Sequence, residues 1–430
     1  MSASDTANER LLPAEREEEM ILSLVPLLRA VHAADTPFMP EEHPLFQPAL
    51  FPDAGGKQIL VPQAFHDAAA LLLEWFGPFY TFHEIRAPLW AETVKMRNDP
   101  SHPIPDDCAR AIIAHLNHPL PGVILTPATF FVPLCGVNIT APIPLGTATI
   151  VPVQDAEAFR AEWGQAHCGT PAIGLPKLNT NHGTAYAQAD VGHATSERQD
   201  ELVQRHVEDA VNLLRYWQHH IGGFQQFNNR PHIGHEPPSV HAVGFGKGDI
   251  HSMTGLTLYQ YSIGTTPIGA DELRQMRARG LAAMIAWQDA PPGTARAVTL
   301  NAARRMGYAW SLFNVEDRIA ASFSAFEGWL RLPDTPKISE TIGRRLAVLI
   351  RRSARSEDFA KQFSKKIYGP IRSAVAHGEG LRPEQPQWID RVITSYGVEA
   401  ILRAIPMIRS EPESWLISDF HAELDGSKTV

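Results

Sequence analysis

Two residues near the C-terminal end of the chain have side chains suited to phosphodiester chemistry. Arg372 and His377 lie five residues apart in the stretch IYGPIRSAVAHGEG, which predicts a helix that stops at Gly378. An arginine can hold a phosphate through parallel N–H donors, and a histidine can transfer protons near neutral pH. The pair is a minimal set of groups for phosphodiester cleavage, although the R-x4-H spacing alone is a weak pattern.

A basic segment leads directly into this pair. From Lys337 to Arg372 there are ten Lys and Arg and three Asp and Glu, a net charge of +7 over 36 residues, whereas the whole chain carries −9. Such a segment can bind the phosphate backbone of RNA or form a solvated helical face. The side chains that we expect to contact RNA are Arg344, Arg345, Arg351, Arg352, Arg355, Lys365 and Lys366.

Composition places the chain among soluble globular proteins. It has 430 residues, 44% of them hydrophobic and 20% charged, which suggests two or three domains. Three cysteines without a CxxC motif favour neither a disulfide scaffold nor a Cys-rich zinc site. The net negative charge argues against a general nucleic-acid coat. The polar, acidic N-terminus and the lack of a long apolar run predict a cytoplasmic protein without membrane contact.

The amino-acid composition and the spacing of apolar residues change along the chain. Residues Gly122 to Val153 are rich in Val, Ile, Thr and Phe with regular Pro and Gly, which predicts short strands. From Asp271 onward the apolar residues follow helical spacing. We therefore expect an α+β N-terminal part over residues 1–267, which senses a trigger or selects a substrate, and an all-α helical bundle over residues 268–430.

Individual elements can be placed more closely. Cys168 to Val191 is expected to be a loop, and Glu197 to Ile221 a long helix. The bundle is expected to begin with a helix from Asp271 to about Trp287. One long helix is then expected from Val298 to Leu330. Further helices are expected over Ser339–Arg352, Glu357–Ala376 and Trp388–Ile405.

The segments FSAFEGWL, TIGRRLAVLI and KKIYGPIRSAVAHGEG follow one another in this order. Together they resemble the HEPN superfamily, and within it the Apea-like HEPN family, over roughly Asp271 to Ile405. HEPN proteins are helical bundles that often dimerise. Many are metal-independent ribonucleases of toxin–antitoxin and phage-defence (antiviral) systems. The resemblance implies catalytic roles for Arg372 and His377, a supporting polar role for Ser373 and an orienting role for Glu327.

The geometry of one helix suggests a composite site. Five residues at about 100° each place Arg372 and His377 about 140° apart around an ideal helix. A homodimer in which each helix contributes part of the pocket relieves this separation. The expected reaction uses the ribose 2′-OH as nucleophile, with His377 moving protons and Arg372 stabilising charge, and it requires neither metal nor other cofactor.

Two other readings of the chain remain open. The bundle can be a non-catalytic module for dimerisation or for binding nucleic acid or nucleotide. The chain can also be a metal-dependent hydrolase that uses the histidine-rich segment His219, His220, His232, His235, His241 and His251. That segment contains no HExxH motif. A glycine-rich stretch, GFGKGDI from Gly244 to Ile250, does not match a phosphate-binding loop, and we interpret it as a hairpin turn.

Overall fold

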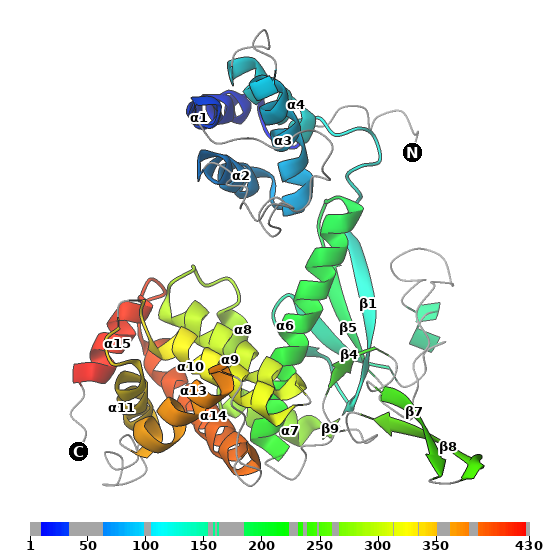
Figure 1. Ribbon diagram of the computed structural model, residues 1–430, viewed down its shortest axis with the longest axis vertical. Helices are drawn as coiled ribbons and strands as arrows, with labels where there is room; N and C mark the ends of the chain where they lie inside the picture. The colour runs from blue at the N-terminus through cyan, green and yellow to red at the C-terminus, as the bar shows by residue number, and fades with distance from the viewer. Residues whose placement is uncertain are drawn as a thin grey trace. The chain divides into compact units, whose positions relative to one another are not determined.

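The computed structural model describes residues 10–33, 63–98, 105–153, 158–159, 161–162, 185–222, 231–234, 239–246, 249–259, 266–312, 314–333, 335–350, 362–377 and 386–426. In these ranges the chain forms helices, a small sheet and a hairpin (Figure 1). Two compact units can be distinguished, residues 1–129 with 190–204 and residues 130–189 with 205–430. The change from strand-like to helical sequence patterns near residue 267 therefore lies inside the second unit.

The first unit contains a group of packed helices. They are α1 (Ala14–Ala33), α2 (Gln63–Phe76), α3 (Phe82–Asn98) and α4 (Pro105–Asn117). Leu24, Leu28, Phe65 and Ile112 are completely buried in their shared core. The side chain of Asn117, also buried, accepts a hydrogen bond from the backbone N–H of Leu12 at 2.7 Å. The apolar faces of these amphipathic helices thus account for the packing of the unit.

The strand-rich segment forms a sheet with the order β3-β4-β5-β1-β6. Its strands are β1 (Ala128–Cys135), β3 (Ile143–Pro144), β4 (Ala148–Pro152), β5 (Ala185–Val191) and β6 (His232–Ile233). The prediction of a loop over Cys168–Val191 is wrong for its last residues, Ala185–Val191, which form β5. There Ala187 pairs with Ile150 of antiparallel β4, and six of the seven residues of β5 are at least half-buried in the sheet. Strand pairing outweighs the weak strand propensity of Ala, Gln and Asp.

Two smaller ladders complete the β structure. Strand β2 (Val137–Ile139) pairs in parallel with β9 (Thr266–Ile268). Strand β7 (Ser239–Gly246) pairs antiparallel with β8 (Asp249–Tyr259), and Gly246 lies opposite Asp249. In the glycine-rich stretch GFGKGDI, Gly244–Gly246 ends β7 and Asp249–Ile250 begins β8, and Lys247 and Gly248, where the turn is expected, lie outside the described residues.

The helices that follow the sheet lie in the second unit, together with most of the long helix α6 (Ser196–Gly222). They are α7 (Ala270–Ala278), α8 (Leu281–Ala286), α9 (Ala295–Ser311), α10 (Val315–Leu330), α11 (Ile338–Ile350), the π-helical turn η2 (Phe363–Tyr368), α13 (Gly369–His377), α14 (Pro386–Ser410) and α15 (Ile417–Gly426). A mixed α and β part followed by helices is therefore correct at this coarse level.

Two of the expected helices are each broken in two. Gly280 separates α7 from α8 because its φ of 123° lies in the left-handed region. A Cβ atom there would lie 2.7 Å from Cδ1 of Ile405 on α14, so the turn also permits a close approach between helices. Asn314 separates α9 from α10: its side chain accepts a hydrogen bond from the backbone N–H of Glu316 at 2.7 Å and begins a new helix.

Helix α10 lies at the centre of this bundle and packs against α9, α11, α13 and α14. Phe326 and Trp329 on α10 are almost fully buried. The indole N–H of Trp329 donates a hydrogen bond to the hydroxyl of Thr299 on α9 at 2.8 Å, so the buried ring leaves its polar atom satisfied. The position of α10 fixes any side chain on its last turn relative to α13.

Candidate active site on the C-terminal helices

The chain reaches α13 through the π-helical turn η2. Phe363 and Tyr368 of this turn are buried, and the Tyr368 ring packs edge-on against Phe323 of α10 with ring centroids 5.0 Å apart. Turns of π-helix are frequent at functional sites because they displace side chains from the regular helical pattern. Here the turn holds the phenol of Tyr368 against α10, directly before the first residues of α13.

A cluster of four side chains forms where α10, η2 and α13 meet. The Glu327 carboxylate accepts hydrogen bonds from the Tyr368 hydroxyl at 2.5 Å and from Nε of Arg372 at 2.5 Å. Nη2 of Arg372 lies 3.3 Å from the second carboxylate oxygen. That oxygen also accepts from Nη1 of Arg331, one turn further along, at 3.4 Å. Glu327 is therefore the centre of the cluster and binds the Arg372 guanidinium along one edge.

The electrostatics of the cluster favour an ionised Glu327. Burial by itself would raise the pKa of this carboxyl group. Hydrogen bonds from Arg372 and Tyr368, together with the charges of Arg372 and Arg331, outweigh burial and hold the pKa below its usual value. The pKa of Tyr368 is raised, first by burial and then by its hydrogen bond to Glu327, so the phenol stays protonated. The hydrogen bond to Glu327 also raises the pKa of Arg372.

The expected site residues differ in how they are placed. Glu327 and Arg372 are in contact, with side chains that are 19% and 46% exposed, so the arginine still reaches solvent. Ser373, the next residue on α13, is exposed. His377 is the last residue of α13, and its side chain lies outside the part of the chain that the structure describes. Pro370 lies in the first turn of α13, where proline is well tolerated, and Arg372 follows it.

Tyr368 is a member of the cluster that the sequence did not single out. It lies four residues before Arg372, in the stretch IYGPIR. A tyrosine one helical turn before an arginine is by itself a weak signal of a shared site. The π-helical turn that contains Tyr368 cannot be predicted from the apolar spacing. Its burial beside a carboxylate is what gives the phenol a polar role.

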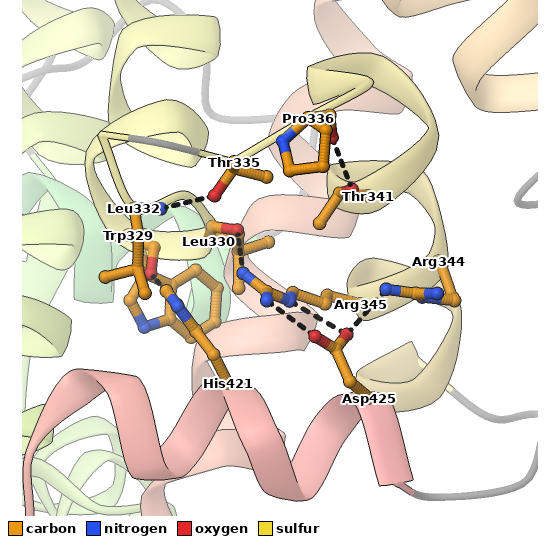
Figure 2. A network of polar contacts seen from close by, with 10 residues as sticks. All are labelled: Trp329, Leu330, Leu332, Thr335, Pro336, Thr341, Arg344, Arg345, His421 and Asp425. Atoms are coloured by element: carbon orange, nitrogen blue, oxygen red, sulfur yellow. Dashed lines mark hydrogen bonds and ion pairs between the residues drawn. The ribbon is translucent and has the colours of Figure 1, made fainter.

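Part of the basic segment forms a structural ion-pair network, which Figure 2 shows between α11 and α15. Arg345 is 5% exposed. Its Nε and Nη2 donate to the two oxygens of Asp425 at 3.1 and 2.7 Å, and its Nη1 donates to the Leu330 carbonyl at 2.6 Å. Arg344 is exposed and donates to the same carboxylate at 2.9 Å. The guanidinium of Arg345 is thus occupied by protein groups, and we leave this residue out of the proposed RNA surface.

A buried histidine belongs to the same region. His421 of α15 is 1% exposed, and its Nε2 lies 2.8 Å from the carbonyl oxygen of Trp329 (Figure 2). Because a carbonyl can only accept, Nε2 carries the hydrogen. Burial lowers the pKa of His421, which keeps the ring neutral. This hydrogen bond joins α15 to the end of α10, two residues from Glu327.

The remaining basic residues fall into two groups. Lys365 and Lys366 on η2 are exposed and lie between α11 and α13 in the chain. The expected RNA contacts Arg351, Arg352 and Arg355 lie outside the described residues. In the described part of the chain, the expected RNA contacts that reach solvent are therefore Lys365 and Lys366 of η2 and Arg344 of α11.

The histidine-rich segment is only partly described. His232 is buried in β6, opposite Cys135 of β1. The side chains of His219, His220, His235, His241 and His251 lie outside the described part. Within the described part, no group of three His, Cys, Asp or Glu side chains is arranged to hold a metal ion. No helix in that part is long and apolar enough to span a membrane.

Neither a family model, nor a curated protein, nor a solved structure matches this chain. The resemblance to the Apea-like HEPN family therefore rests on the motifs in the sequence.

Proposed function

We propose that the chain is a metal-independent endoribonuclease of a defence or toxin system, in which Arg372 and His377 act on RNA. The observation that carries this proposal is the fixed but exposed guanidinium of Arg372. Glu327 binds its Nε and Nη2 edge, and the Tyr368 hydroxyl donates to the same carboxylate oxygen as Nε of Arg372. A guanidinium is planar with five N–H donors, and among the described residues Glu327 occupies only Nε and Nη2, which leaves Nη1 as a donor for a phosphate.

The proposed reaction follows from these groups. The ribose 2′-OH loses its proton to His377 and attacks the adjacent phosphorus, the bond from phosphorus to the 5′-oxygen of the next nucleotide breaks, and a water molecule protonates that 5′-oxygen. Arg372 stabilises the charge that builds on the phosphoryl oxygens. The products are a 2′,3′-cyclic phosphate and a 5′-hydroxyl end. Ser373, next to Arg372 and exposed, is a polar group for the same phosphate.

The proposed RNA path follows the exposed basic side chains. Lys365 and Lys366 lie on the turn that leads to Arg372, and Arg344 is exposed on α11. Arg351, Arg352 and Arg355 belong to the same basic segment of the sequence. Contacts of this kind bind backbone phosphates without reading the base sequence, so the choice of RNA target falls to the N-terminal part of the chain.

A second candidate is a non-catalytic protein of the same bundle type that dimerises or binds nucleic acid or nucleotide. The Arg372–Glu327 ion pair favours it, because that pair satisfies the arginine charge without any substrate. The two candidates differ in one respect: only the enzyme loses its effect on RNA when His377 alone is replaced.

The proposal is tested by sequencing the RNA of cells that express the wild-type chain and of cells that express His377→Ala at the same level. The enzyme produces new RNA ends in the first culture and none in the second. Identical RNA pools, with both proteins folded, would favour the non-catalytic candidate.

A further inference from the structure

A hollow of about 430 Å³ lies in the second unit, between the α7–α8 turn and one face of α14. Leu402, Pro406 and Arg409 follow one another at steps of four and three residues and so share a helical face. Arg279 and Gly280 line the opposite side. At this turn a Cβ atom on residue 280 would lie 2.7 Å from Cδ1 of Ile405, so Gly280 allows the turn to lie close to the Ile405 side chain.

The rim of the hollow is positively charged. It carries three guanidinium groups, from Arg279, Arg403 and Arg409, against the single carboxylate of Glu399. That carboxylate accepts a hydrogen bond from Nη2 of Arg403 at 3.3 Å, and the Arg403 side chain is still 52% exposed. Three positive groups and one negative group leave a net charge of +2 in a chain whose total is −9. Such a concentration of arginine attracts an anion with several oxygen acceptors.

The other residues that line the hollow are apolar. Leu402, Ile405 and Pro406 supply apolar surface. Pro406 lies inside α14 and has no N–H to donate to the carbonyl of Leu402, so the regular helical hydrogen bond cannot form there. The hollow therefore combines apolar surface with three guanidinium groups, and its volume exceeds that of an inorganic anion and lies in the range of small-molecule sites.

We propose that this hollow binds a small phosphorylated organic molecule. Its phosphate is held by Arg403 and Arg409, with Arg279 across from them, and its organic body lies against Leu402 and Pro406. The site is separate from the Glu327–Arg372 cluster and shares no residue with it. Binding here therefore does not depend on whether the chain cleaves RNA.

The test is isothermal titration of the full-length protein with adenosine monophosphate, uridine monophosphate and glucose 6-phosphate. The dephosphorylated forms of all three serve as controls, together with inorganic phosphate. At least one phosphorylated probe is expected to bind with one-to-one stoichiometry below about 1 mM, and its dephosphorylated form to bind at least tenfold more weakly. Arg403→Gln and Arg409→Gln are each expected to weaken binding by about tenfold or more, with thermal unfolding confirming that the variants fold.

Two matched variants locate the binding. Arg274→Gln removes an exposed charge from α7 outside the hollow, and Arg372→Ala removes the arginine of the candidate active site. Arg274→Gln is expected to bind the probe as the wild type does, since screening limits the effect of a distant charge. Arg372→Ala removes any second binding event at the candidate active site and is expected to retain binding at the hollow. The proposal is overturned if no phosphorylated probe binds, if inorganic phosphate binds as well as they do, or if Arg372→Ala abolishes binding while the Arg403 and Arg409 variants retain it.

Discussion

At the scale of single residues, Glu327 has the most consequential position in the candidate site. Its carboxylate is bound by Arg372, Tyr368 and Arg331, and Arg372 and Tyr368 belong to the helical turns that begin the R-x4-H motif. Because the ionised form is the one that these donors stabilise, the pKa of Glu327 is lowered in spite of burial. The ionisation state of the Glu327 carboxyl group therefore affects both the orientation of Arg372 and the packing of α13 on α10.

Replacing Glu327 by Gln is expected to make stability less dependent on acid pH. A lowered pKa in the folded state adds stability that is present above the unfolded-state value, near 4.5, and is lost as the pH falls through the lower folded-state value. Urea unfolding should find Glu327→Gln about 1 kcal/mol less stable than the wild type at pH 7. This difference should shrink toward zero in acid.

The control for this prediction is Glu340→Gln. Glu340 is an exposed carboxylate on α11, 3.7 Å from Lys337, and its loss should change stability little. If the stability of Glu327→Gln and of the wild type fell in parallel across the acid range, the ion pair with Arg372 would contribute nothing to folding.

The sequence could suggest part of this cluster and not the rest. The order of motifs pointed to Glu327 and Arg372, which lie 45 residues apart and are in contact. Tyr368 could not be found in this way, because its phenol reaches Glu327 only through the π-helical turn η2. Arg345 belongs to the basic segment of the sequence, but its partner Asp425 is 80 residues away and only the fold brings the two together.

At the scale of elements, α15 holds the C-terminal helices together through polar contacts. Asp425 receives both Arg344 and Arg345 from α11, and His421 donates to the end of α10 (Figure 2). The two arginines differ in environment, with exposed side-chain fractions of 53% for Arg344 and 6% for Arg345. A buried charge that loses its partner is costly, whereas an exposed ion pair contributes little.

The Asp425→Ala substitution is therefore expected to destabilise the protein by about 3 kcal/mol, because it leaves the Arg345 guanidinium buried without a counter-charge. The Arg344→Ala substitution removes an exposed partner of the same carboxylate and should cost less than about 1 kcal/mol. Both values can be measured by urea unfolding at pH 7. Equal costs for the two variants would show that the burial of Arg345 has no energetic role.

The elements differ in how far local sequence determines them. Helices α10, α11 and α14 follow from apolar spacing. The break before α10 depends on one capping residue, Asn314, whose cap is followed by acidic residues in the first helical turn. The break after α7 depends on the φ angle of Gly280 and on its contact with Ile405, 125 residues away. Strand β5 depends on pairing with β4, which no local pattern in AYAQADV indicates.

At the scale of the whole molecule, the proposed site needs side chains from two copies of the chain. Arg372 lies in the first turn of α13 and His377 at its end, so one helix does not present both on one face. We expect a homodimer through the helices that carry the motif, with each site completed by the partner. Sedimentation at micromolar concentration should find a species of twice 47.5 kDa.

Co-expression of two variants is an independent test of the homodimer with a composite site. Arg372→Ala and His377→Ala chains produced together should form mixed dimers that regain part of the cleavage lost by each alone. A protein that sediments as a monomer and shows no such recovery would require a site within one chain or a bundle without activity.

We propose that Arg372 and His377 cleave RNA through the ribose 2′-OH without a metal ion. The most direct test incubates purified protein with an RNA substrate in EDTA and determines the chemistry of the new ends. The account predicts 2′,3′-cyclic phosphate or 3′-phosphate ends and no cleavage when deoxyribose replaces ribose at the cut site. It also predicts a loss of about 10²–10⁴-fold for His377→Ala, and failure of Arg372→Lys, since a point charge cannot replace the guanidinium fork. Activity that needs added Mg²⁺ or Zn²⁺, cuts DNA equally well and survives His377→Ala would contradict it.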